Sequence, residues 1–238
     1  MTPIRIDPES EAEAAVWALT REIVTLFSAL PWVLIGGQMV AIHEAEHGIR
    51  PLRSTVDVDA LVDVRTLSTA TLAAARLLQG ASFSAQHDVD GLAYRFVRGQ
   101  DIVDILAPDH LGKNADLTTA PPDTTLEALG GRQALNRRRT VLVDSGDGQF
   151  EVPIPSLAGA IVIKARVAAA SRQPEKHWRD LARLLALVDD PDAVRRELTS
   201  SDRSYLRSRS ALLDRLHPAW RGIRRVDDAM AALEILGE

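Results

Sequence analysis

Apolar side chains recur at helical spacing over residues 9–30 and then give way to continuous apolar runs. The first pattern predicts a helix that Pro31 ends, and the next run predicts a buried strand at 32–35. A shorter helix is expected at 39–46, where Gly48 follows as a breaker. This order predicts a sheet with helices packed against it.

The middle of the chain alternates between extended and turn-forming segments. Gly99 and Gln100 form a turn between two predicted strands, and a Ser-Gly-Asp-Gly turn joins two others into an expected hairpin. The segment 109–140 is polar, and we expect it to wrap the core with a short helix near Leu126. The predicted strands are 55–62, 91–97, 102–106, 141–143 and 150–154, with a further helix at 67–78.

The pattern becomes wholly helical after Pro155 and stays so to the end of the chain. We therefore expect an α/β fold with a mixed sheet flanked by helices over residues 1–155, and a helical C-terminal half over 156–238. No repeat or low-complexity linker separates the two parts. The predicted boundary is a change of architecture rather than a flexible hinge.

Composition narrows the function classes. The chain has 238 residues, 46% of them hydrophobic, which is enough for one sizeable core or two small domains in close contact. It contains no cysteine, which excludes disulfides, thiolate metal sites and thiol nucleophiles. Its apolar runs are too short to span a bilayer and its first residues are acidic, so we expect a cytoplasmic protein without a membrane partner.

Positive charge is concentrated near the C-terminus of an otherwise acidic chain. The net charge is -5, yet the segment 195–225 holds nine arginines against three acidic residues. Such a local basic face suits a polyanion such as RNA, although a solvated helical face explains it equally well. A smaller cluster at Arg137, Arg138 and Arg139 could extend an RNA-binding track or belong to a solvated loop.

The chemistry-bearing residues gather in one stretch. Gly36 and Gly37 follow a predicted strand, where a glycine lets the backbone approach a phosphate and the following helix aims its free N–H groups at that anion. Asp57 and Asp59 are spaced by one residue on an expected strand, so both carboxylates would face the same side and could share a divalent metal.

This stretch resembles the AbiE-type toxin branch of the nucleotidyltransferases, which includes the MenT-type toxins of type IV toxin–antitoxin systems. The family pattern is a Gly-Gly or Gly-Ser turn followed by an Arg-x-Thr-x-Asp-x-Asp run. The matching residues are Gly36, Gly37, Arg53, Thr55, Asp57 and Asp59, and His43 resembles family members with a histidine at the end of the intervening helix.

The resemblance implies a third carboxylate on an adjacent strand in an apolar-Asp-apolar setting. Asp104 has this setting, and strand alternation separates it from Asp101, which faces the other way. We therefore expect Asp104 as a metal ligand and as the general base for the attacking hydroxyl. A strand-edge aspartate facing water is the alternative interpretation.

Four further residues receive roles from the resemblance. Lys164 lies in an apolar helix, so its ammonium group must reach water or a buried anion, and the resemblance implies contact with the triphosphate. Asp180 would complete the catalytic site by orienting Lys164 or assisting proton transfer. Arg53 could bind the triphosphate as a fork, and Thr55 could orient the metal-binding strand.

The resemblance also implies the reaction. The enzyme would use Mg²⁺, as a two-metal site, to move a nucleoside monophosphate from a nucleoside triphosphate (NTP) to the 3′ end of tRNA and block translation. A cognate antitoxin would be a partner. The alternatives are transfer to a small-molecule hydroxyl such as an antibiotic, transfer to a protein hydroxyl, and a non-catalytic module that binds RNA or protein.

A second motif competes with this interpretation. The segment from His43 through Glu44 to His47 matches the His-Glu-x-x-His pattern of zinc metalloproteases. The pattern has no certain third ligand, and Gly48 cuts the helix short immediately afterwards. The plain alternative is a hydrogen-bonded His43 under the metal-binding strand and a His47 at a helix C-terminus, where a cation is favoured.

Overall fold

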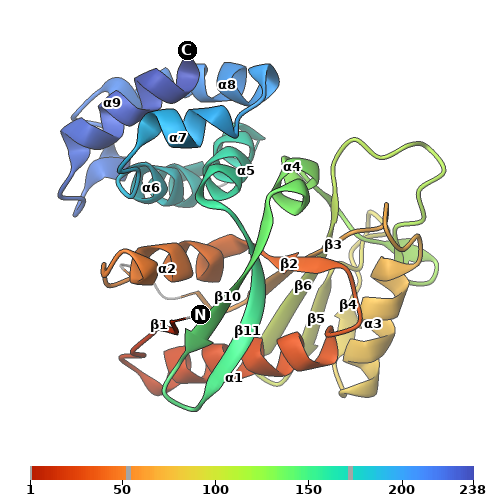
Figure 1. Ribbon diagram of the computed structural model, residues 1–238. Coiled ribbons are helices and arrows are strands. Elements are labelled where there is room, and N and C mark those ends of the chain that lie inside the picture. Colours follow the sequence, from red (N-terminus) through yellow and green to blue (C-terminus); the bar gives the residue numbers. More distant parts are fainter. Residues whose placement is uncertain (1, 52–54, 171–173) are drawn as a thin grey trace.

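The computed structural model describes residues 2–51, 55–170 and 174–238 (Figure 1). Within these ranges every strand lies before residue 156. The strands are β1 (Ile4–Arg5), β2 (Trp32–Leu34), β3 (Val58–Val62), β4 (Ser84–Gln86), β5 (Arg95–Arg98), β6 (Asp101–Pro108), β7 (Thr118–Ala120), β8 (Asp123–Thr124), β9 (Glu127–Ala128), β10 (Arg138–Asp144) and β11 (Gln149–Pro155).

Helices precede, interrupt and follow these strands. They are α1 (Glu11–Leu26), α2 (Gly36–Glu46), α3 (Ala70–Gly80), α4 (Gly131–Asn136), α5 (Leu157–Ala170), α6 (Pro174–Leu185), α7 (Pro191–Arg196), α8 (Ser200–Arg207) and α9 (Val226–Gly237), with short 3₁₀ helices η1 (Ser210–Leu213) and η2 (Pro218–Trp220). None of the helices in the described ranges combines the length and apolarity that crossing a bilayer requires.

The central sheet has the strand order β2-β3-β6-β5-β4, and β9 pairs with β6 beyond this path. β3 and β6 run parallel, whereas β2, β5 and β4 pair antiparallel to their neighbours. A second sheet joins β1 to the β10–β11 hairpin, and β7 pairs with β8. The expected mixed sheet with flanking helices is confirmed.

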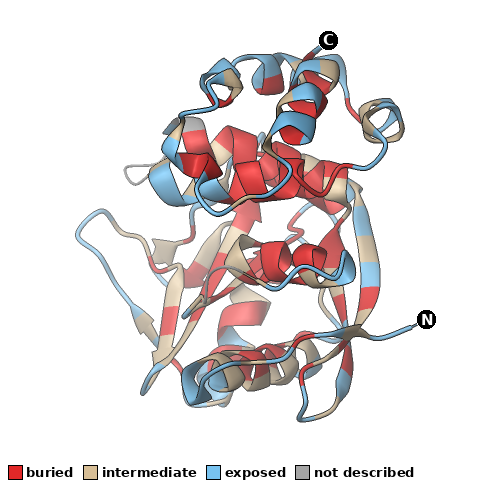
Figure 2. Ribbon diagram, turned by 90° about the vertical axis from the view of Figure 1, so that its left-hand side faces the viewer, coloured by how far each residue is buried: buried red, intermediate tan, exposed pale blue. Residues whose placement is uncertain are grey.

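Helices cover the sheet on both sides (Figure 1). α1 and α3 pack on one side and share a core with strand residues such as Val62 and Ile105. On the other side, α2 and α4 lie between the sheet and the C-terminal helices (Figure 1). Figure 2 shows a continuous block of buried residues within those C-terminal helices, and α5 contributes Ile161 and Val162 to it. An apolar helix such as α5 is stable there because neighbours cover it all round.

Buried ion pairs join the two halves of the chain. Arg183 of α6 forms a buried pair with Glu44 of α2. Arg166 of α5 lies 3.6 Å from the Asp109 carboxylate, which also accepts hydrogen bonds from the backbone N–H groups of Gly130 and Arg132. Because breaking a buried pair leaves an uncompensated charge, these contacts fix α5 and α6 against the sheet-bearing part.

Several element boundaries differ from the sequence prediction. The first helix ends at Leu26 rather than at residue 30, because the chain turns so that the Phe27 ring packs edge-on against Trp32 at 5.6 Å. The helix expected near Leu126 is wrong: the Leu126 carbonyl accepts a hydrogen bond from the Ala107 backbone at the edge of the sheet. The helix of this segment is α4, which begins at Gly131.

Candidate active site

The carboxylates of Asp57, Asp59 and Asp104 lie together at one end of the β3–β6 pair. One carboxylate oxygen from each lies within 4.8 Å of the others. The parallel register sets Asp59 directly beside Asp104. Asp57 was predicted to lie on a strand, but it lies in the bend before β3. There its carboxylate accepts a hydrogen bond of 2.7 Å from the Thr55 hydroxyl. The structure therefore brings the three predicted acids together.

We call the carboxylates of Asp57, Asp59 and Asp104 the triad, and Gly36 lies directly against it. Gly36 is the first residue of α2 and has φ of +74°, a left-handed conformation that favours glycine. A Cβ at this position would lie 1.7 Å from Oδ2 of Asp59. Gly37 is the next residue of α2. Because the helix begins here rather than at residue 39, its first N–H groups start next to the triad, a ready position for an anion.

The triad concentrates negative charge in a poorly solvated place. Burial, with the neighbouring carboxylates of Asp57 and Asp104, raises the pKa of Asp59 to about 7, while Lys164 and Lys176 act to lower it. Burial also raises the pKa of Asp104, against the opposing effect of Arg95. Bringing a cation to the site would therefore relieve a strong electrostatic cost.

Arg95 is a site residue that the sequence analysis missed. Its guanidinium donates Nε–H and Nη2–H hydrogen bonds of 2.8 and 2.7 Å to the two oxygens of Asp104, and Nη2 lies 3.5 Å from Asp57. The antiparallel β5–β6 register pairs Arg95 with Asp104 and Arg98 with Asp101. Because the turn at Gly99 and Gln100 was recognised, counting outward from it would have found this partner.

Lys164 and Asp180 form a buried pair beside the triad. The Nζ of Lys164 donates a 2.8 Å hydrogen bond to Oδ2 of Asp180, and the two side chains are 6% and 1% exposed. Lys164 is close enough to Asp59 to lower its pKa. The structure thus joins these two predicted residues, from α5 and α6, and places the ammonium of Lys164 near the triad.

Lys176 adds positive charge near the triad. Lys176, in the first turn of α6, is exposed and lowers the pKa of both Asp59 and Asp104. Arg53, the predicted triphosphate fork, lies outside the described residues.

The histidine motif on α2 does not form a metal site. The buried His43 ring makes a 3.1 Å hydrogen bond through Nε2 with the Pro155 carbonyl, and burial lowers its pKa to about 4. Nδ1 of His47 lies 2.8 Å from the His43 carbonyl oxygen, and Glu44 is paired with Arg183. Across the described ranges, the triad is the one group of three or more potential metal ligands. The hydrogen-bonded alternative for His43 is confirmed, although its partner is the end of β11.

Six of the nine arginines of the C-terminal segment fall into two groups. Arg215 and Arg225 form ion pairs with acids of the same helical region, and the guanidinium of Arg209 stacks over Trp178 at 5.5 Å. Arg196 and Arg203 line a shallow groove of about 330 Å³ on α7 and α8 together with Arg195 and Asp192. Of the earlier cluster, Arg137 and Arg139 pair with Asp202 and Glu46, so two of its three members serve packing between elements.

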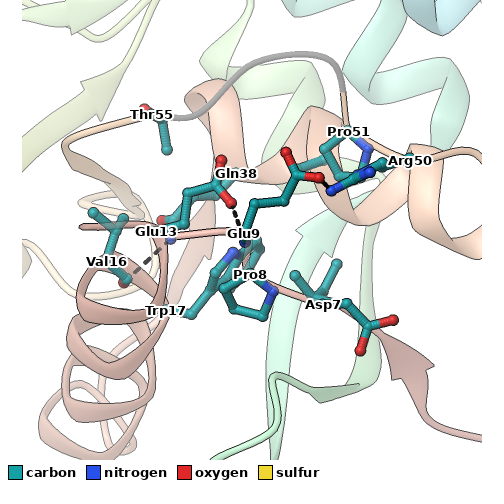
Figure 3. Close-up of a pocket in the computed structure, with 12 residues that line it drawn as sticks. Asp7, Pro8, Glu9, Glu13, Val16, Trp17, Gln38, Arg50, Pro51 and Thr55 are labelled. Carbon is teal, nitrogen blue, oxygen red and sulfur yellow. Dashed lines mark hydrogen bonds and ion pairs between the residues drawn. The ribbon is translucent and has the colours of Figure 1, made fainter. Parts of the chain in front are cut away.

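A separate small pocket lies between the start of α1, the first turns of α2 and Thr55 (Figure 3). It has a volume of about 40 Å³, and an ion pair between Glu9 and Arg50 crosses its edge (Figure 3). Gln38 lines it and binds back to α1 through the Thr20 hydroxyl. Its lining includes none of the triad carboxylates, so this pocket is separate from the triad.

The donor set of the triad fits a hard divalent cation. It offers three carboxylates, the ligands that Mg²⁺ prefers, within a span that one or two ions can share. Burial and the neighbouring carboxylates raise the pKa of Asp59, and the positive charges of Lys164 and Lys176 offset this only in part. The residues present therefore fit Mg²⁺.

No protein-family model matches the chain, and a search of curated proteins found no match. Among solved structures, the chain is similar to an antigenic nucleotidyltransferase-like protein from Paracoccidioides brasiliensis, with 16% identity and a TM-score of 0.52 over 94% of each chain. ANT(2″)-Ia in complex with adenylyl-2″-tobramycin gives a TM-score of 0.47 and 14% identity over 82% of this chain and 98% of that chain. JHP933 from Helicobacter pylori gives a TM-score of 0.47 and 13% identity over 96% of this chain and 91% of that chain. The likeness to the Paracoccidioides protein shows that the fold is nucleotidyltransferase-like.

Proposed function

We propose that this protein is a Mg²⁺-dependent nucleotidyltransferase that moves a nucleoside monophosphate from an NTP to an acceptor hydroxyl. The observation that carries the proposal is the triad, whose three carboxylates converge within 4.8 Å beside the N-terminus of α2. The nucleotidyltransferase-like fold supports it, as does the resemblance of the glycine turn and the aspartates to the AbiE-type family. The predicted roles of Gly36 and Gly37 in phosphate binding follow from the same position.

The reaction joins the acceptor oxygen to the α-phosphorus and breaks the bond to the departing pyrophosphate. Bound Mg²⁺ would neutralise charge on the triphosphate and on the attacking oxygen. Asp57 and Asp59 are proposed as its ligands together with Asp104. Asp104 is also the proposed general base for the hydroxyl proton, as the resemblance to the AbiE-type family implies.

Lys164 supplies positive charge to the triphosphate in this scheme. Its ammonium is held by Asp180 at 2.8 Å, and the pair is almost completely excluded from water. An ammonium fixed in this way loses little freedom when a phosphate oxygen reaches it. Asp180 thus acts by positioning Lys164, one of the two roles that the resemblance to the AbiE-type family left open.

RNA is the acceptor that we propose, with the 3′ end of tRNA as its site and a block of translation as its consequence. The support is the resemblance of the glycine and aspartate motifs to AbiE-type toxins, together with the basic C-terminal segment. Arg195, Arg196 and Arg203 converge on one groove, where a phosphate backbone can be bound through its charge. A cognate antitoxin is the corresponding proposed protein partner.

The test is transfer of label from each of the four NTPs to total tRNA in the presence of Mg²⁺. Three proteins are compared: the native chain, Asp59→Asn, and the matched control Asp101→Asn, whose carboxylate lies on β6 but pairs with Arg98. Label on tRNA with the native chain and Asp101→Asn, but not with Asp59→Asn, is expected.

Two other results would change the conclusion. Label found on protein, or on an added aminoglycoside in place of RNA, would support nucleotide transfer but refute RNA as the acceptor. If no acceptor is labelled, or if Asp59→Asn transfers as much label as the native chain, the proposed enzymatic function is refuted and a non-catalytic binding module is the remaining interpretation.

A further inference from the structure

The side of the triad that a metal would use already holds a cation. Both oxygens of Asp104 accept hydrogen bonds from the Arg95 fork, at 2.8 and 2.7 Å. The second nitrogen of the fork lies 3.5 Å from Oδ2 of Asp57, whose other oxygen is bound by Thr55. Within the described ranges, Asp59 makes no side-chain hydrogen bond of its own. A divalent ion would therefore meet two carboxylates that are already neutralised in part.

We propose that Arg95 is a resident cation that competes with the divalent metal for Asp104 and Asp57, and that the nucleotide resolves this competition by accepting the displaced guanidinium on its triphosphate. This inference rests on the proposed nucleotidyltransferase function. It adds a residue that links metal loading to substrate arrival. The metal-free and substrate-free enzyme would thus be held in a weakly metal-binding state.

Coulomb's law supports the competition. A guanidinium within hydrogen-bonding distance of the same oxygens repels a dication strongly in a site of low dielectric. The two-pronged fork also occupies one lone pair on each Asp104 oxygen. Metal binding at full strength therefore requires the guanidinium of Arg95 to move away.

The exposure of the two partners shows which one is free to move. The Arg95 side chain is 34% exposed, whereas that of Asp104 is 8% exposed and lies within a central strand. The Arg95 backbone is fixed by β5–β6 pairing, so the long side chain can swing while its base stays beside the site. A triphosphate in the site offers the oxygens that an arginine fork binds best.

Arg98 provides a matched control on the same strand. Its guanidinium makes a two-pronged contact with Glu22 at 2.7 Å and a second contact with Asp101 at 2.8 Å. Neither acid belongs to the triad. Replacing Arg98 therefore removes an arginine of equal charge from β5 without freeing a proposed metal ligand.

The experiment measures Mn²⁺ binding by electron paramagnetic resonance, which reports free ion and needs no catalysis. Native protein, Arg95→Gln, Arg98→Gln and Asp59→Asn are titrated without nucleotide, after circular dichroism and thermal melting have shown that each is folded. Arg95→Gln is expected to bind Mn²⁺ at least tenfold more tightly than the native chain. Arg98→Gln should bind like the native chain, and Asp59→Asn should lose the site.

Addition of a non-hydrolysable NTP analogue gives the second readout. It should raise the Mn²⁺ affinity of the native chain by a larger factor than that of Arg95→Gln, in which no guanidinium has to be displaced. Arg95→Lys keeps the positive charge but cannot form the two-pronged contact. The analogue should raise its Mn²⁺ affinity by a factor between those of the native chain and Arg95→Gln.

Equal or weaker Mn²⁺ binding by Arg95→Gln would overturn the inference and make Arg95 a support that holds Asp104 in place for the metal. A native chain and Arg95→Gln that both fail to bind Mn²⁺ at millimolar concentration, with and without nucleotide, would instead refute the metal site of the proposed function. The two failures are therefore distinguishable.

Discussion

Replacement of Gly36 by alanine tests whether the close approach of α2 to the triad is needed for chemistry. Two costs follow from the structure. The left-handed backbone, with φ of +74°, costs a residue with a Cβ roughly 1–2 kcal/mol. The new Cβ would also lie 1.7 Å from Oδ2 of Asp59, and separations under 3.0 Å essentially never occur, so this oxygen must retreat by at least 1.3 Å.

Gly48 separates these two costs. It has φ of +67°, close to that of Gly36, but a Cβ there would meet nothing within 4 Å. Gly48→Ala should therefore lose about 1 kcal/mol of unfolding free energy in urea and keep its activity. Gly36→Ala should lose more stability than Gly48→Ala, because the displacement of Asp59 adds to the backbone strain. Because misplacement of a catalytic group by about 1 Å can cost about 100-fold, Gly36→Ala should also lose at least that much of its nucleotide-transfer rate.

The assay pairs urea unfolding with the initial rate of label transfer for both variants and the native chain. Transfer by Gly36→Ala at the native rate would refute the reasoning, because Asp59 could then tolerate the displacement. A loss of rate in Gly48→Ala as large as that in Gly36→Ala would refute it as well, since backbone strain alone would explain both.

Two further predictions concern buried charge. A carboxyl whose pKa is raised from 3.8 to about 7 binds protons more tightly in the folded state, so the metal-free stability contributed by Asp59 should fall as pH rises from 4 to 7. The full pKa shift corresponds to about 4 kcal/mol of unfolding free energy, of which we expect about half because Asp59 keeps some exposure. Asp59→Asn should therefore be about 2 kcal/mol more stable than the native chain at pH 8 in EDTA. Equal or lower stability of Asp59→Asn in urea unfolding would contradict this. Lys164→Met should lose about 3 kcal/mol, the lower end of the cost of breaking a buried pair, because Asp180 loses its ammonium partner while the guanidinium of Arg183, 3.7 Å away, still offsets part of its charge. The double change with Asp180→Asn should recover part of that loss in the same assay. A single variant as stable as the native chain would show that the pair is not needed for folding.

Local patterns and the family resemblance together predicted that the three acids would converge, and the structure places them together. Two strands in parallel register bring Asp59 and Asp104 side by side, and strand alternation distinguished Asp104 from Asp101. Asp57 was assigned to a strand that begins at residue 55, but Val56 is 66% exposed and the chain bends there. Alternating valines looked like a strand, whereas the Thr55–Asp57 hydrogen bond holds a turn.

Long-range partners could not be predicted in the same way. Glu44 and Arg183 lie 139 positions apart, and no local pattern links a glutamate of α2 to an arginine of α6. That same glutamate was instead part of an apparent zinc motif, because sequence spacing cannot show that its carboxylate is already neutralised. Arg95 was different, since the recognised hairpin turn contained the register needed to find it.

The division of the site between early and late parts of the chain has a consequence for synthesis. As the polypeptide leaves the ribosome, Gly36 and the triad emerge well before Lys164 and Asp180. A growing chain that has not yet produced α6 leaves Glu44 without the arginine that neutralises it. A stalled or cleaved fragment that ends before α6 therefore lacks part of the proposed site, and under the proposed function it would not carry out the transfer.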